Sequence, residues 1–179
     1  MNLPNSLTTL RIFLIPIIVV FYYIDIPGEL FGTPINFVVV AGIFAVASLT
    51  DLLDGYLARK YNLITTYGKF MDPLADKILV VSALLLLVES ALVPAWIVAI
   101  IVAREFIVSG LRMMLSDKGV VHAAQLTGKI KAAVTMVAIV LLFLTPLQEI
   151  GLILIYVAAM LTLWSGMDYL LQAKDVIFS

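Results

Sequence analysis

The sequence contains no cysteine and a single histidine, His122, and only 13% of its residues are charged. Without cysteine, the chain has no disulfide, no thiolate zinc site and no cysteine nucleophile. A single histidine also disfavours a histidine-based metal site and a Ser-His-Asp triad. His122 has no evident partner, and we assign it no role.

Apolar residues, in contrast, make up 63% of the 179 residues. Soluble domains are nearer half apolar and a quarter charged, so this excess indicates a membrane protein. No cleavable signal is expected, because the first apolar stretch lacks a small-residue cleavage site and further spans follow it. The chain shows no internal repeat, low-complexity tract or linker, and we expect residues 1–179 to form one domain.

We identify six segments as candidates for crossing a bilayer, which requires about 20 mostly apolar residues in a helix. These candidate spans lie near residues 6–25, 34–58, 70–90, 93–116, 128–146 and 150–171. Turn-forming residues such as Pro27-Gly28 and Thr145-Pro146 separate them. The sequence therefore predicts an all-α membrane protein, a bundle of six transmembrane helices, with a short interfacial segment over residues 1–10.

Charge is distributed unequally between the predicted loops. Most of the 11 basic residues lie between spans two and three, around the junction of spans four and five, and near the termini: Arg59, Lys60, Lys69, Arg112, Lys118, Lys129, Lys131, Arg11 and Lys174. The opposite loops contain Asp25, Glu29, Glu89 and Glu149, and no lysine or arginine. Because positive charge is retained in the cytoplasm, both termini and both basic loops should be cytoplasmic.

Four aspartates interrupt the second and third spans: Asp51, Asp54, Asp72 and Asp76. The members of each pair are three or four residues apart and so share one helix face. A short basic loop joins the two spans, which places both pairs at the same depth. Two such pairs facing each other form a site of oxygen ligands only, which suits Mg²⁺ or Mn²⁺. Four carboxylates can hold two such ions, an arrangement used in phosphoryl displacement.

Simpler roles are available for these residues taken singly. Asp72 before Pro73 is also typical of a helix N-cap followed by proline at the first helical position. Asp51 and Asp54 could instead pair with Arg59 or Lys77 at a helix end. Neither alternative explains all four aspartates together.

The acidic residues belong to a longer pattern, D-x2-D-G-x2-A-R-x8-G-x3-D-x3-D, which runs from Asp51 to Asp76 without a departure. This pattern resembles the signature of the CDP-alcohol phosphotransferase family, whose members share a six-helix membrane domain. The segments NLPNSLTTLRIFLIP, GKFMDPLADK, AREFIVSGLR and TGKIKAAVTM resemble the bacterial branch that uses sn-glycerol 3-phosphate as acceptor. The resemblance covers nearly the whole chain.

The resemblance implies that the four aspartates bind two divalent cations, Mg²⁺ or Mn²⁺, and that Asp76 is also the general base. The 1-hydroxyl of sn-glycerol 3-phosphate would attack the lipid-side phosphorus of CDP-diacylglycerol and release CMP. Phosphoryl transfer depends mainly on charge neutralisation and in-line positioning, so no enzyme nucleophile is required. The resemblance also implies a homodimer in the bacterial cytoplasmic membrane, with membrane lipids and no nucleic acid as partners.

A nucleotide site is expected beside the metal ligands. Its candidate residues are Asn5, Thr8, Gly55, Ala58, Arg59 and Gly68. The two small residues of the second span leave room beside the metal ligands, although helix packing explains Gly55 equally well. Arg59 suits bidentate contact with a phosphate, or it is only a marker of topology. Asn5, Thr8 and Arg11 recur every three residues, so we expect them to share one helix face that points towards the same cavity. The roles of Asn5 and Thr8 near the CDP group come from the resemblance, and helix capping is the alternative.

A second group of charges lies on spans four and five. Arg104 and Glu105 fall in mid-span, where charge is least favourable unless it faces the bundle interior or a water-filled cavity. Candidate residues for binding the acceptor phosphate are Arg104, Arg112, Lys129 and Lys131. The lysines have an alternative role in fixing topology or contacting anionic lipid. Asp168 is a candidate counter-ion for this group.

Two other functions remain open at this point. Another member of the same family would use phosphatidylglycerol or inositol phosphate as acceptor. A divalent cation transporter would use the carboxylates as a transport site. The transporter hypothesis explains neither the basic group nor the complete signature.

Overall fold

The structure is a computed structural model that describes residues 3–60, 66–117 and 126–177. Side chains are described for residues 6–50, 68, 71–111, 113–115, 128–167 and 169–171. The described residues form six α-helices: α1 (Leu3–Tyr23), α2 (Ile35–Lys60), α3 (Thr66–Glu89), α4 (Ala95–Asp117), α5 (Leu126–Phe143) and α6 (Gln148–Ile177). Two short strands, β1 (Glu29–Leu30) and β2 (Thr33–Pro34), and a 3₁₀ turn, η1 (Thr145–Leu147), complete the fold.

The predicted six-helix, all-α architecture is confirmed, and each helix overlaps one of the predicted spans. Within the described ranges, two stretches, Ser6–Tyr23 and Thr145–Leu171, are long and apolar enough to cross a membrane by length and composition. A shorter apolar stretch covers Ile35–Thr50. Crossing of the membrane by all six helices therefore stays a prediction.

A short interfacial segment was predicted over residues 1–10, and its position at a membrane interface stays a prediction. From Leu3 onward the chain is part of one uninterrupted helix that continues to Tyr23. Pro4 permits this early start, because a proline in the first helical turn lacks only an N–H that would have no partner there. Two polar residues further along α1, Thr8 and Arg11, are completely buried in the bundle.

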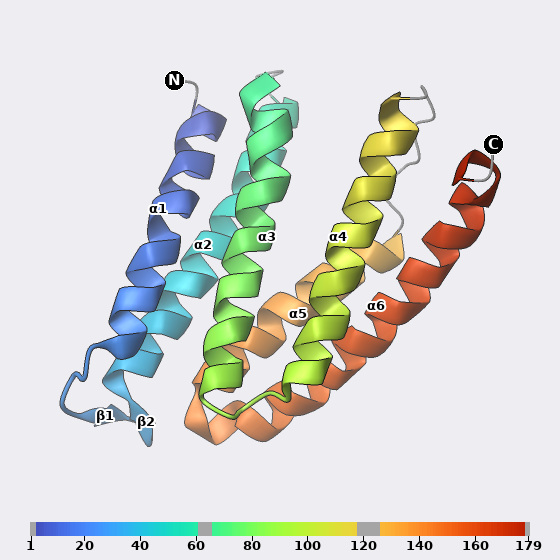
Figure 1. The fold of residues 1–179 in the computed structure, drawn as a ribbon. Coiled ribbons are helices and arrows are strands. Elements are labelled where there is room, and N and C mark those ends of the chain that lie inside the picture. Colours follow the sequence, from blue (N-terminus) through green and yellow to red (C-terminus); the bar gives the residue numbers. More distant parts are fainter. Residues whose placement is uncertain (1–2, 61–65, 118–125, 178–179) are drawn as a thin grey trace.

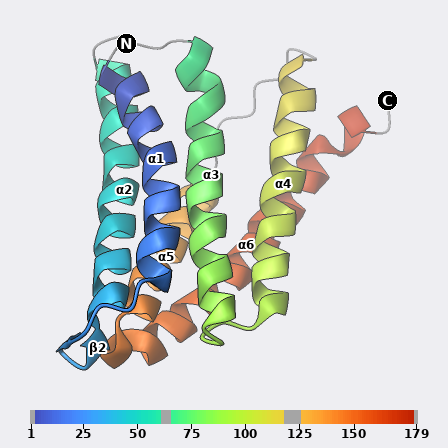
Figure 2. The same ribbon diagram turned by 60° about the vertical axis from the view of Figure 1, so that its left-hand side comes forward.

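The helices alternate in direction, so the end of α2 and the start of α3 lie at one end of the bundle (Figure 1). The first turns of α1 and α3 lie there with the last turns of α2, α4 and α6, and both termini are at this end. Figure 2 shows the same arrangement from another direction. The β1–β2 hairpin and the α3–α4 and α5–α6 connections lie at the opposite end.

The helices pack around one main apolar core. Helix α1 packs against α2 and α3, while α6 packs against α5 and α4. Fully buried apolar side chains come from several helices, including Phe44, Leu84, Ile139 and Ile155. Gly151 allows a close approach of α6 to α5, because a Cβ atom at this position would lie 2.9 Å from the backbone nitrogen of Leu142.

The hairpin was not predicted, because two-residue strands are too short for a recognisable pattern. Its strands pair antiparallel, and its glycines adopt positive φ angles of 112° at Gly28 and 74° at Gly32. The Thr33 hydroxyl accepts a hydrogen bond of 2.9 Å from the backbone N–H of Thr145, which ties the hairpin to the α5–α6 connection. This contact closes the end of the bundle that lies away from the aspartates.

Candidate active site

Asp72 and Asp76 lie one turn apart on the same face of α3, near the end of the bundle that holds the termini. Helix α3 begins at Thr66, so Asp72 is not at its start and Pro73 lies inside it. The alternative interpretation of Asp72 as an N-cap is therefore wrong. The carboxylates extend from a continuous helix, which fixes their spacing.

A contact between helices orients the first of these carboxylates. The hydroxyl of Thr8 in α1 donates a hydrogen bond to Oδ1 of Asp72. Thr8 is completely buried, as is Arg11 on the same face of α1. A threonine hydroxyl carries no charge, so this contact orients the carboxylate without neutralising it. The predicted inward face of α1 is confirmed for Thr8 and Arg11, whereas the Asn5 side chain lies outside the described part of the chain.

The other predicted residues of the acidic site belong to the last turns of α2, which ends at Lys60. The backbone of α2 places these turns at the same end of the bundle as the first turns of α3 (Figures 1 and 2). The side chains of Asp51, Asp54, Gly55, Ala58 and Arg59 are outside the described residues.

Among the described side chains, no three acidic or histidine residues are placed so that they could hold a metal ion. The four-aspartate site is untested, because two of its members are not among these side chains. Gly68 is buried in the first turn of α3. Carboxylate oxygens are the ligands that Mg²⁺ and Mn²⁺ prefer, so Asp72 and Asp76 suit such an ion in chemistry and spacing.

Asp76 also lines a small cavity of about 40 Å³ between α3, α4 and α5. Three further charged side chains, Lys77, Glu105 and Lys131, reach this cavity. The rest of its wall is mainly apolar, with Leu84 among the lining residues. The structure thus brings the candidate general base and one candidate acceptor-binding lysine to the same internal space.

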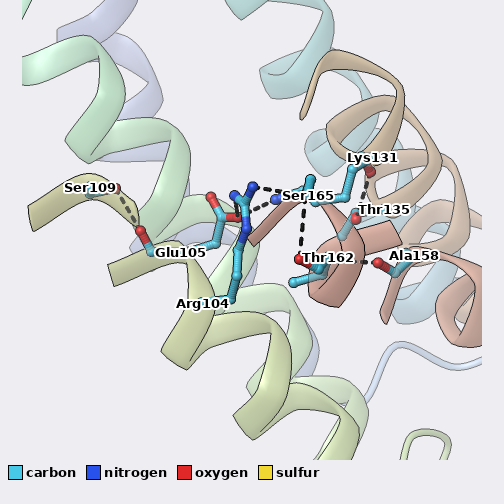
Figure 3. A network of polar contacts seen from close by, with 8 residues as sticks. All are labelled: Arg104, Glu105, Ser109, Lys131, Thr135, Ala158, Thr162 and Ser165. Carbon is cyan, nitrogen blue, oxygen red and sulfur yellow. Dashed lines mark hydrogen bonds and ion pairs between the residues drawn. The ribbon is translucent and has the colours of Figure 1, made fainter. Parts of the chain in front are cut away.

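The mid-span charges of α4 form a network with α5 and α6 (Figure 3). Arg104 donates from Nη1 to Oε1 of Glu105 at 3.0 Å and from Nη2 to Oγ of Ser165 at 2.8 Å. Lys131 donates from Nζ to the same Oε1 of Glu105. The predicted cations Arg104 and Lys131 are therefore both bound to one carboxylate.

The network is largely shielded from solvent. The exposed fractions of the Arg104, Glu105 and Lys131 side chains are 15%, 23% and 7%. The expectation that mid-span charges face the interior is confirmed for Arg104 and Glu105. Lys129, in contrast, is exposed. The side chains of Arg112, Asp168 and His122 fall outside the described residues.

Glu105 and Ser165 were not predicted to be partners of these cations. A signal for Glu105 was available, because a carboxylate in mid-span requires a cationic partner. Ser165 gave no comparable signal, since serine in an apolar helix commonly hydrogen-bonds a backbone carbonyl of its own helix. Its Oγ does so here, donating to the Thr162 carbonyl at 3.3 Å while it accepts from Arg104.

The six-helix bundle and the pair of carboxylates on α3 agree with the family signature found in the sequence. The model of the CDP-alcohol phosphatidyltransferase family matches residues 1–164, and the chain belongs to this family.

Its relatives cover almost its full length. A protein of Bacillus subtilis is 42% identical, with 94% of this chain and 93% of the relative aligned. Proteins of Rickettsia bellii and Escherichia coli K12 are 38% and 37% identical over 97% of this chain and 96% and 95% of their own. All three relatives are named CDP-diacylglycerol–glycerol-3-phosphate 3-phosphatidyltransferase.

Proposed function

We propose that this protein transfers the phosphatidyl group of CDP-diacylglycerol to sn-glycerol 3-phosphate, giving phosphatidylglycerol phosphate and CMP. The observation that carries the proposal is the near-complete alignment with relatives named for this reaction. The site agrees with it, because the candidate base Asp76 and the cation of Lys131 line one cavity. A phosphorylated acceptor requires a base for its hydroxyl proton and, close to that base, a cation for its phosphate.

We further propose that residues 1–179 form one domain whose six helices all cross the bacterial cytoplasmic membrane. The end of the bundle at which both termini lie would face the cytoplasm. Support comes from the two long apolar stretches and from the acidic residues at the opposite end, including Asp25 and Glu149. A homodimer is an expectation from the family resemblance alone.

For the metal site, we propose two divalent cations, Mg²⁺ or Mn²⁺, held by Asp51, Asp54, Asp72 and Asp76. Support comes from the spacing of Asp72 and Asp76 on α3 and from the position of the α2 end beside the start of that helix. When bound, such cations supply charge neutralisation at the pyrophosphate and stabilise the departing CMP.

The chain's own residues carry the remaining steps. Asp76 takes the proton of the acceptor's 1-hydroxyl as the new oxygen–phosphorus bond forms and the bond from phosphorus to the CMP oxygen breaks. The electron pair of the broken bond leaves with CMP. Thr8 orients Asp72 through its hydroxyl.

The substrates would be bound by two groups of residues. CDP binding is assigned to Asn5, Thr8, Gly55, Ala58, Arg59 and Gly68. Binding of the acceptor phosphate is assigned to Arg104, Arg112, Lys129 and Lys131. Lys131 has the strongest structural support in the second group, because it lies on the wall of the cavity that Asp76 lines.

A test of the acceptor uses purified full-length protein with CDP-diacylglycerol and Mn²⁺, and measures CMP release and the lipid product. We expect phosphatidylglycerol phosphate only when sn-glycerol 3-phosphate is supplied. Phosphatidylglycerol and inositol phosphate, each supplied alone, serve as matched controls. Product formation with one of these and not with glycerol 3-phosphate would reject the proposed acceptor. Metal uptake by proteoliposomes that lack CDP-lipid would instead favour a transporter.

A further inference from the structure

Glu105 lies near the middle of α4, which runs from Ala95 to Asp117. Its side chain contacts two other charged side chains. Its Oε1 atom accepts hydrogen bonds from both Arg104 and Lys131. One carboxylate thus holds two cations, and the group carries a net charge of one positive unit. Neither the family signature nor the proposed mechanism uses Glu105.

The neighbouring helices fix Arg104 in this group. Ser165 of α6 accepts from Nη2 of Arg104 at 2.8 Å. Gly166 leaves space for the arginine, because a Cβ atom there would lie 3.0 Å from its Cγ. Arg104 is thereby held against α6, and Glu105 is left to connect α4 with Lys131 of α5 (Figure 3).

Lys131 belongs both to this network and to the wall of the cavity that the candidate base lines. It is 5% exposed and lines the cavity of about 40 Å³ to which Asp76 also contributes. A lysine has a flexible four-carbon stem, and ordering that stem during ligand binding lowers affinity. A carboxylate that already holds the ammonium group removes most of this cost before the ligand arrives.

We propose that Glu105 is a positioning residue for the acceptor: its carboxylate holds the Lys131 ammonium at the wall of the cavity that Asp76 shares, and this contact sets the KM for the phosphorylated acceptor. The inference rests on the proposed function. In this account Glu105 acts through Lys131, because its Oε1 accepts hydrogen bonds from Lys131 and from Arg104.

A purely structural role predicts a different outcome. If the network only ties α4 to α5 and α6, its loss lowers the thermal stability of the protein without distinguishing between substrates. A positioning role raises the KM for one substrate and leaves the other unchanged. The two roles are therefore separated by comparing the two KM values.

The primary variant is Glu105→Gln, which keeps the shape of the side chain and removes its charge. We expect the KM for sn-glycerol 3-phosphate to rise about tenfold, the size of effect produced by weakening one charge-assisted hydrogen bond. The KM for CDP-diacylglycerol and kcat should stay within about twofold. Glu149→Gln is the matched control, because Glu149 is an exposed residue at the opposite end of the bundle.

A double-mutant cycle tests whether Glu105 acts through Lys131. Lys131→Met should raise the KM for glycerol 3-phosphate, and the Glu105→Gln/Lys131→Met double variant should show no further rise. The double variant removes both charges of the Glu105–Lys131 pair, and Arg104 keeps its hydrogen bond to Ser165, so this variant remains informative if Glu105→Gln does not fold.

Three results would overturn the inference: an unchanged KM in Glu105→Gln, an equal rise for both substrates, or a further rise in the double variant. A wild-type protein that makes no product from glycerol 3-phosphate would instead refute the proposed function, and this inference with it. Activity of the wild type with an unchanged KM in Glu105→Gln removes only the role of Glu105.

Discussion

Replacement of Asp76 by asparagine will stop product formation, with kcat falling by about 10³-fold or more. Asparagine keeps the size of the side chain and one oxygen, but it does not accept the proton of the acceptor hydroxyl. The position of Asp76 on the wall of the cavity shared with Lys131 makes this carboxylate our candidate for that proton. Binding of CDP-diacylglycerol should be largely preserved, because the nucleotide contacts are assigned to other residues.

The measurement is CMP release by purified Asp76→Asn with both substrates and saturating Mn²⁺. Asp25→Asn is the control, because Asp25 is an exposed aspartate in the loop before β1, away from the site. We expect the control to have wild-type kcat. CMP release at a comparable rate in Asp76→Asn, dependent on glycerol 3-phosphate, would show that another group takes the proton.

Removal of divalent cations will abolish activity completely. The substrates are all anionic, and the site adds four carboxylates, so the reacting groups repel one another unless cations neutralise them. Activity should fall to background in excess chelator and return when Mg²⁺ or Mn²⁺ is added. An equal ionic strength of KCl should not restore it.

The residues that bind the cations are tested by Asp72→Asn. We expect the Mn²⁺ concentration for half-maximal activity to rise by about tenfold or more, since one charged ligand is lost. Thr8 would still be able to donate to the remaining oxygen of the asparagine, so the fold should be little affected. A chelated wild-type protein with full activity, or an unchanged Mn²⁺ requirement in Asp72→Asn, would contradict the proposed metal site.

The helices could be predicted from the sequence because a long apolar segment in a bilayer has few stable backbone conformations other than a helix. Segments of about 20 apolar residues satisfy their backbone hydrogen bonds internally only as helices. Helix ends were less predictable, as α3 shows. Pro73 suggested a start at Asp72, whereas the helix begins at Thr66 and accommodates the proline inside it.

The site was predictable only where its geometry follows from one helix. The spacing of Asp72 and Asp76 placed both on one face of α3, and the structure agrees. Contacts between helices depend on packing angle and register, which single-chain spacing does not specify. For this reason the sequence indicated an inward face for Thr8 but not its bond to Asp72, and cations near Glu105 but not their attachment to it.

The most direct test of the account is a crystal structure with Mn²⁺ and CDP-diacylglycerol, recorded at the manganese absorption edge. We expect anomalous peaks between the last turns of α2 and the first turns of α3, within bonding distance of the carboxylates of Asp51, Asp54, Asp72 and Asp76. A map in which these carboxylates point away from one another, or are bound by lysine and arginine with no manganese between them, would contradict the metal-dependent mechanism.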